Sequence, residues 1–238
     1  MNVELEILLA TAVSIGFVHT VLGPDHYIPF IMLAKASKWS KSKTIFITLL
    51  SGVAHVLSSV VVGLIGVALG IAVHKLSFFE SVRGNIAGYM LIAFGLAYTI
   101  YGIRKSHKAK THSHSHFHSD GQTHLHEHNH SKSDHLHLHN DAKADKIKFW
   151  AVFAVFIFGP CEPLIPILMY PAAKSSIAWT ILVVIVFGVI TISTMLAIVM
   201  LSLKGIDLLP ISKLEKHIDV IAGVIILLSG LMMQFFGM

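Results

Sequence analysis

Long apolar runs, separated by short polar connections, make up most of this chain. Runs long enough to cross a membrane core of about 30 Å lie at residues 5–34, 44–73, 86–103, 147–172, 177–203 and 218–236. Only 13% of the 238 residues are charged, whereas soluble domains carry about 25%. The pattern predicts an all-α membrane protein with six transmembrane helices.

The first and fourth runs contain residues that a bilayer disfavours. Gly-Pro-Asp-His-Tyr-Ile-Pro occupies 23–29, and Gly-Pro-Cys-Glu-Pro-Leu-Ile-Pro occupies 159–166, 136 residues later. A charge at the centre of a membrane helix costs about 2.5–3.5 kcal/mol even on a lenient scale. Backbone freed by proline is tolerated at that depth only where it lines a protein cavity. We therefore expect helices 1 and 4 to be discontinuous.

The two halves of the chain share further spacings beyond the breaks. Gly52 matches Gly188, and at a constant offset of 135 Ala87-Gly88, Gly95-Leu96 and Gly102 match Ala222-Gly223, Gly230-Leu231 and Gly237. The alternative is that small residues recur by chance for helix packing. Three spans per half make the second half enter the membrane from the opposite side, so we predict a 3+3 inverted repeat. Its parts are 1–105, a connecting loop at 106–145, and 146–238.

Basic residues are unevenly shared between the connections. Fifteen of the 18 Lys and Arg lie on the side that holds loops 1–2, 3–4 and 5–6. The positive-inside rule then predicts a multi-pass protein of the cytoplasmic membrane with both termini outside. The first six residues lack the basic region of a cleavable signal, so the first span is expected to remain in the mature protein. The net charge of +5 reflects these loops, so the expected partner is the lipid bilayer and not nucleic acid; the oligomeric state stays open.

Four ionisable residues of the first two runs form a candidate metal site: His19, Asp25, His26 and His55. On an unbroken helix His19 and His26 would lie about 10.5 Å apart, too far for one ion with bonds of about 2.0–2.1 Å. The Gly-Pro break removes this objection. Imidazoles with a carboxylate suit Ni, Co, Zn or Cu(II) better than Ca or Mg. Alternatively, Asp25 and His26 only fix the break, and His55 makes a bond between helices.

The second half contributes a different set of polar residues. Cys161 and Glu162 lie at its break, and Thr191 aligns approximately with His55. We treat these three as candidates for coupling or for a second-half site. Glu162 could instead neutralise a neighbour or carry protons, and Cys161 could be a small buried hydrophobe. A single cysteine excludes an internal disulfide and a dithiol shuttle.

The loop at 106–145 holds 12 of the 17 histidines. Its low apolar content predicts disorder, and its His-rich tracts predict metal binding, against the alternative of a solvated linker. On the predicted orientation it lies in the cytoplasm. The candidate loop ligands are His112, His114, His116, His118, His124, His126, His128, His130, His135, His137 and His139.

The first break resembles a known family signature. His19, five residues and then Asp25-His26 resemble the His-x4-Asp-His motif of the nickel/cobalt transporter superfamily, and residues 23–29 look closest to its urease-accessory-type members. The His-rich loop is similar to that of the nickel/cobalt efflux branch. The resemblance implies a divalent-metal permease with His19, Asp25 and His26 as ligands and His55 as the span-two histidine. The spacing departs from the motif by one residue, and the Leu-Gly-x-Asp-Thr-Ala-Thr-Glu-like segment of the importers is absent.

These features together predict a secondary transporter that moves Ni²⁺ or Co²⁺, with Zn²⁺ as a further candidate substrate, across the cytoplasmic membrane. Efflux is the favoured direction, because the predicted orientation places the His-rich loop in the cytoplasm. Coupling to protons is expected, because metal loading releases protons. We expect no prosthetic group, no catalytic residue and no enzyme activity, and a Gly-x4-Gly-Lys-[Ser/Thr] phosphate loop is absent. The alternatives are an exporter of an anion or small organic acid and, with less support, a membrane metalloenzyme.

Overall fold

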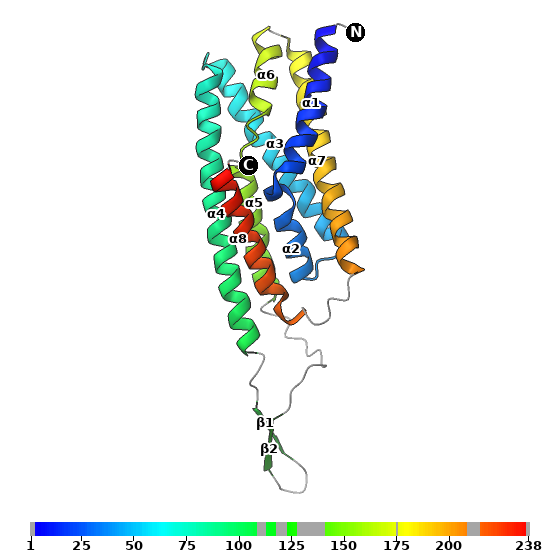
Figure 1. The fold of residues 1–238 in the computed structure, drawn as a ribbon, viewed down its shortest axis with the longest axis vertical. Coiled ribbons are helices and arrows are strands. Elements are labelled where there is room, and N and C mark those ends of the chain that lie inside the picture. Colours follow the sequence, from blue (N-terminus) through cyan, green and yellow to red (C-terminus); the bar gives the residue numbers. More distant parts are fainter. Residues whose placement is uncertain are drawn as a thin grey trace.

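The computed structural model describes residues 3–108, 113–117, 123–127, 141–174, 176–208 and 215–236. Within them, long helices run side by side along one axis (Figure 1). The eight described α-helices are α1 (Val3–Leu22), α2 (Ile28–Ala36), α3 (Lys41–Ala68), α4 (Val73–Lys108), α5 (Asp141–Phe158), α6 (Leu164–Ala173), α7 (Ile177–Asp207) and α8 (Ile218–Phe236). Short 3₁₀ turns η1 (Pro24–His26) and η2 (Glu215–His217) precede α2 and α8.

The apolar surface of the bundle is that of a membrane protein. Five of the described helices, α1, α3, α4, α7 and α8, are long and apolar enough to cross a bilayer. Their outer faces expose large apolar side chains such as Phe46, Ile65 and Ile181, which a soluble protein would cover. The prediction of an all-α, multi-pass membrane protein in contact with lipid is therefore confirmed. The fourth expected span corresponds to α5 and α6, which are separate helices.

Both expected helix breaks are present, and Pro29 and Pro163 lie where a backbone N–H would have no partner within the helix. α1 ends at Leu22 and α2 begins at Ile28, and α5 ends at Phe158 and α6 begins at Leu164. In Figure 1 the two pieces of each broken helix follow one another along the bundle axis. Pro29 falls in the first turn of α2 and Pro163 immediately precedes α6. Backbone N–H groups at these positions have no partner within the helix, so proline costs little there.

Helices of the two halves pack against each other in pairs. α4 lies along α8, and α1 lies along α7 (Figure 1). Gly95 meets the backbone of Leu227, and Gly223 meets the backbone of Thr99, so closely that neither position has room for a Cβ atom. Close backbone approach of this kind is how membrane helices associate. The matched glycines of the third and sixth runs that the structure describes thus line one helix interface, and Gly237 lies outside the described residues.

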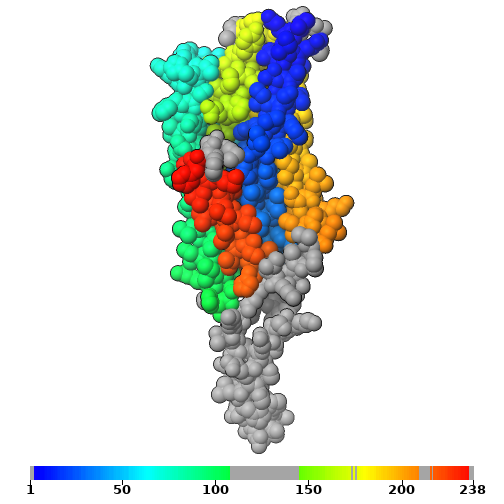
Figure 2. Space-filling view, in the orientation of Figure 1, coloured from blue at the N-terminus to red at the C-terminus, as the bar shows by residue number. Residues whose placement is uncertain are grey.

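Two groups of buried apolar side chains fill the interior. One contains Phe30, Leu91 and Ile226 and joins α2, α4 and α8, with α3, α5 and α7 also contributing. The other contains Leu168 and Phe187 and joins α1, α3, α6 and α7. Figure 2 shows α1, α4 and α8 on one face of the packed bundle. The packing fixes the positions of both helix breaks relative to α3, which passes beside each of them.

Part of the His-rich loop is described as two strands, β1 (Ser113–Phe117) and β2 (Thr123–Glu127). They pair antiparallel, with His114 opposite His126 and His116 opposite His124. The remaining candidate loop ligands lie outside the described residues: His112, His118, His128, His130, His135, His137 and His139.

Candidate metal centre

Three histidines from separate elements meet in the middle of the bundle. His19 comes from α1, His26 from η1 and His55 from α3. Each offers one nitrogen, and these three atoms all lie within 4.8 Å of one another. The ring centroid of His26 lies 4.6 Å from that of His19 and 5.0 Å from that of His55. The first break therefore brings together the three imidazoles that the sequence indicated.

The backbone of the first break explains this arrangement. The Gly23 N–H donates to the His19 carbonyl at 3.0 Å and closes α1, and the His26 N–H donates to the Gly23 carbonyl at 3.0 Å and forms the tight turn. The His26 ring folds back over this turn, so that a Cβ atom at Gly23 would lie 2.5 Å from His26 Nδ1. Glycine at position 23 is thus required for His26 to reach His19.

The site is buried and contains many polar atoms without partners. His26 and His55 are each only 2% exposed. The buried ring nitrogens without a hydrogen bond are His19 Nε2, both nitrogens of His26 and His55 Nε2, and the neighbouring Asp25 Oδ1 shares this state. A buried polar group without a partner costs about 1–3 kcal/mol. A cluster of such atoms indicates a place where a ligand supplies the missing partners.

Neighbouring oxygens set which ring nitrogens can bind a cation. His55 Nδ1 lies 3.3 Å from the Phe156 carbonyl oxygen. A carbonyl only accepts, so Nδ1 carries the proton and Nε2 presents a lone pair. Asp25 Oδ1 lies 3.3 Å from His26 Nδ1. Asp25 therefore sits beside His26 and outside the three-nitrogen group, in the place of the carboxylate that orients a metal-binding histidine.

The donor set is suited to a transition-metal ion. Two nitrogens bound to one ion at about 2.0–2.1 Å lie no more than about 4.2 Å apart. The rings, whose nitrogens lie within 4.8 Å of one another, would need to close only slightly around the ion. Imidazole nitrogens favour Zn, Cu, Ni and Co over Ca and Mg, which prefer oxygen.

The second-half candidates lie around this centre and not among its three nitrogens. Glu162 is exposed and, with His19, lines a cleft of about 540 Å³ between α1, α4 and the second break; its walls α1 and α4 are visible in Figure 2. Thr191 is fully buried, and a Cβ atom at Gly16 would lie 3.3 Å from its hydroxyl. Cys161 is also fully buried.

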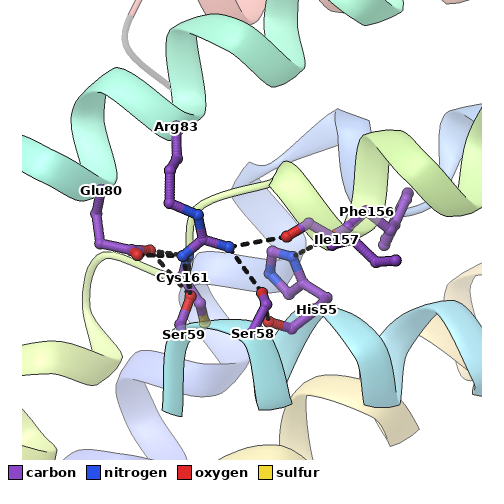
Figure 3. A network of polar contacts seen from close by, with 8 residues as sticks. All are labelled: His55, Ser58, Ser59, Glu80, Arg83, Phe156, Ile157 and Cys161. Atoms are coloured by element: carbon purple, nitrogen blue, oxygen red, sulfur yellow. Dashed lines mark hydrogen bonds and ion pairs between the residues drawn. The ribbon is translucent and has the colours of Figure 1, made fainter. Parts of the chain in front are cut away.

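A buried charged network lies beside the second break, and sequence reasoning missed it. Glu80 and Arg83, on α4, form an ion pair that is almost wholly buried (Figure 3). Ser59 Oγ donates to Glu80 Oε2 at 2.9 Å, and Arg83 Nη2 donates to Ser58 Oγ at 2.8 Å. The Cys161 N–H donates to Ser59 Oγ at 3.1 Å and to Glu80 Oε2 at 3.2 Å. The pair thus ties α4 and α3 to the break.

The same network caps the end of α5. Arg83 Nη2 donates to the Ile157 carbonyl at 2.8 Å, and the preceding carbonyl, that of Phe156, faces His55 Nδ1. The last carbonyls of a helix lack partners within the helix, so Arg83 and His55 supply them here. The sequence signal was an acid and a base three residues apart, a spacing that pairs on one helix face. The expected third span, 86–103, excluded both residues, whereas α4 begins at Val73.

Comparison with known protein families gives one match. The model of the family described as cytochrome c biogenesis protein transmembrane region matches residues 28–232. The matched range includes α2 to α7 and most of α8. It contains His55 and the second break, and it begins after His19 and His26. No curated protein and no solved structure matches the chain.

This match corrects two of our expectations. The nickel/cobalt transporter superfamily was the wrong family, and the predicted secondary transport of Ni²⁺ or Co²⁺ is overturned with it. The resemblance was drawn from the His-x5-Asp-His and Gly-Pro-Asp-His-Tyr-Ile-Pro segments, which together cover only residues 19–29, and from the His-rich loop. A family model that covers residues 28–232 draws on far more positions. The chain belongs to the cytochrome c biogenesis protein transmembrane region family.

Proposed function

We propose that this protein is a metal-binding membrane component of cytochrome c biogenesis. One divalent transition-metal ion would be held by His19, His26 and His55. The observation that carries this proposal is the buried group of three imidazoles, whose nitrogens lie within 4.8 Å of one another and include atoms without partners. Zn²⁺, Co²⁺, Ni²⁺ and Cu²⁺ fit such a donor set. The ion is a bound ligand, and we assign it no catalytic step.

The charge around the histidines supports a bound cation. Asp25 Oδ1 is buried, makes no hydrogen bond and lies 3.3 Å from His26 Nδ1. A carboxylate buried inside a membrane protein is costly. A divalent ion beside His26 would offset that cost, and the carboxylate would fix the orientation of the His26 ring. The cleft that reaches His19 offers a path by which such an ion exchanges with its surroundings.

A second candidate function is thiol–disulfide transfer, which family membership and the place of Cys161 at the second break favour. Attack by the Cys161 thiolate on a partner's disulfide would form a mixed disulfide and release one partner thiolate. A second partner thiol would then have to displace Cys161, because the 238 residues contain one cysteine. Complete burial of Cys161 weighs against this function.

The finer architecture and the orientation belong to the same proposal. Breaks in the first and fourth runs and glycine-lined contact between α4 and α8 support a six-span, 3+3 inverted repeat. Fifteen of 18 basic residues on one side support a cytoplasmic-membrane protein with both termini outside and the loop at 106–145 in the cytoplasm.

Metal binding to the purified full chain tests the main proposal. The 12 histidines of the loop would also bind metal, so they are first replaced by asparagine. We expect this background variant to retain one equivalent of Zn²⁺ after dialysis, with X-ray absorption showing three imidazole ligands. A further His19→Ala/His26→Ala/His55→Ala change should remove it. Retention of the zinc in that triple variant, or its absence from a folded background variant, would refute the site.

A thiol assay separates the second candidate. Cys161→Ser should leave zinc binding intact, because the thiol is not among the three ligands. If thiol transfer is the function, membranes treated with acid and a maleimide should contain a mixed disulfide between the wild-type chain and another protein, and Cys161→Ser should lack it.

A further inference from the structure

A cavity of about 870 Å³ lies where α2, α3, α4 and α7 meet the start of α8. The proposed metal site plays no part in it. Charged residues dominate its polar lining, with five lysines against three carboxylates: Lys35, Lys38, Lys41, Lys105 and Lys204 against Asp207, Glu215 and Asp219.

Two of the three carboxylates are already engaged. Lys35 Nζ lies 2.8 Å from Asp207 Oδ1, and Lys105 Nζ lies 2.8 Å from Asp219 Oδ2. The other three lysines, at positions 38, 41 and 204, are exposed, and their side-chain ammonium groups make no hydrogen bond or ion pair with any residue that the structure describes. The cavity therefore presents an excess of positive charge, which indicates an anionic ligand.

The backbone at Lys38 adds a second observation. Lys38 has a φ of 49°, in the left-handed region. The Trp39 N–H donates to the Ala34 carbonyl at 2.9 Å and the Lys38 N–H donates to the Lys35 carbonyl at 3.3 Å, which is the pattern of a helix end that normally takes glycine or asparagine. Lysine is strained in this conformation. Strain of this kind points to a functional use of the side chain.

Trp39 supplies a third observation. It lines the cavity, and its Nε1 is buried without a hydrogen-bond partner. A buried N–H donor needs an acceptor. Apolar residues continue the lining, and one of them, Leu201, is 69% exposed beside the charged part. A ligand that fits has anionic oxygens next to an apolar body.

We propose that this cavity binds the phosphate group of an anionic phospholipid. Basic pockets between membrane helices bind such headgroups, and tryptophan concentrates at the same depth of the bilayer. Lys38, Lys41 and Lys204 would contact the phosphate oxygens, the Trp39 N–H would donate to one of them, and an acyl chain would lie against Leu201. Free phosphate shares the charge but has no use for the apolar part of the lining.

Native mass spectrometry of the full chain in detergent tests the proposal with phosphatidylglycerol and phosphatidylcholine as probes. We expect phosphatidylglycerol to bind at least about tenfold more tightly, since each lysine near a lipid headgroup contributes roughly fivefold. Lys38→Gln/Lys41→Gln/Lys204→Gln should lower that preference by about tenfold or more. Lys75→Gln/Arg104→Gln/Lys146→Gln removes the same charge from exposed positions outside the cavity and should change the preference less than about twofold.

Two results would overturn the lipid site. Equal losses in the two triple variants would mean that the preference reflects general surface charge. Displacement of phosphatidylglycerol by millimolar inorganic phosphate, with no preference left between the two lipids, would assign the cavity to a soluble anion. Trp39→Phe keeps the ring and removes only the N–H donor, so it should weaken phosphatidylglycerol binding by about threefold; unchanged binding would refute the donor role of Trp39.

Discussion

The two helix breaks of this protein have similar sequences and opposite polar chemistry. At the first break, ring nitrogens of His19 and His26 and a carboxylate oxygen of Asp25 are buried without hydrogen bonds. At the second, Glu80 and Arg83 supply partners for the backbone on both sides of the interruption. Backbone and charge inside a membrane must be satisfied in either case. The protein does this internally at the second break, whereas the first break keeps buried polar atoms without partners, which the proposed cation would supply.

The largest expected effect comes from disrupting the buried Glu80–Arg83 ion pair at the second break. Glu80→Gln leaves Arg83 buried without its counter-charge, and loss of one member of a buried ion pair costs about 3–5 kcal/mol. The denaturation midpoint in detergent should fall accordingly. The double change Glu80→Leu/Arg83→Leu should recover part of the lost stability, although the Ile157 carbonyl then lacks its partner. Wild-type stability in Glu80→Gln would show that the network does not hold the second break.

Replacement of one of the three histidines at the first break should have the next largest effect. His26→Ala deletes the central ring of the group and should weaken Zn²⁺ binding by more than the roughly 10–100-fold that changes around a ligand cost. Stability without metal should fall, because the change leaves a cavity in place of a buried ring and removes the side chain that lies 3.3 Å from Asp25 Oδ1. Isothermal titration in the background without loop histidines measures the Zn²⁺ affinity, and the denaturation midpoint of the metal-free protein in detergent measures the stability. His74→Ala, at an exposed position on α4, is the control, and equal affinities in the two variants would contradict the comparison.

A smaller effect is expected at the carboxylate beside His26. Asp25→Asn keeps the shape of the side chain and removes the charge, so Zn²⁺ affinity should fall by about 10–100-fold. Titration at constant pH measures it, and Asp145→Asn, in an ion pair with Lys43 away from the site, is the matched control. An unchanged affinity in Asp25→Asn would mean that the carboxylate serves only the turn.

The smallest effect is expected at Cys161. Cys161→Ala removes a fully buried thiol that behaves as a small hydrophobe, so stability should fall by only about 1 kcal/mol. The affinity for Zn²⁺ should stay within about twofold, since the loss of an actual ligand would cost more than the 10–100-fold of an outer partner. A large loss of Zn²⁺ affinity in Cys161→Ala would show that the second break contributes to the metal site. The two breaks would then no longer differ in their polar chemistry.

The breaks and the three histidines could be predicted from sequence because their cause is local. Gly-Pro in an apolar run interrupts any helix, and a polar residue beside it needs a cavity. The meeting of His55 with His19 and His26 required only that α3 pass the first break. The place of Asp25 beside His26, instead of among the three nitrogens, depends on the geometry of η1 and was not readable from spacing.

The Glu80–Arg83 pair and the family could not be obtained in the same way. Hydropathy places span ends where charges occur, so both residues fell outside the expected third span. Their burial results from contact with Ser58 and Ser59 of α3 and with the second break, which are distant in sequence. The family resemblance was drawn from the short segment at residues 19–29 and from the composition of the His-rich loop, whereas the matching family model covers residues 28–232.

The bond from Arg83 to the Ile157 carbonyl has a mechanical consequence. Widening the second break would expose the Arg83 guanidinium and the Ile157 carbonyl to hydrocarbon in the same movement. Because both exposures are costly, this part of the bundle is expected to be rigid. At the first break no side chain from another helix makes a hydrogen bond or ion pair with the described residues 23–26, and the Tyr27 hydroxyl spans the turn with one bond of 3.2 Å to the Val21 carbonyl. Bending of the bundle is therefore expected at Gly23, and any motion that changes the spacing of the three imidazoles should begin there.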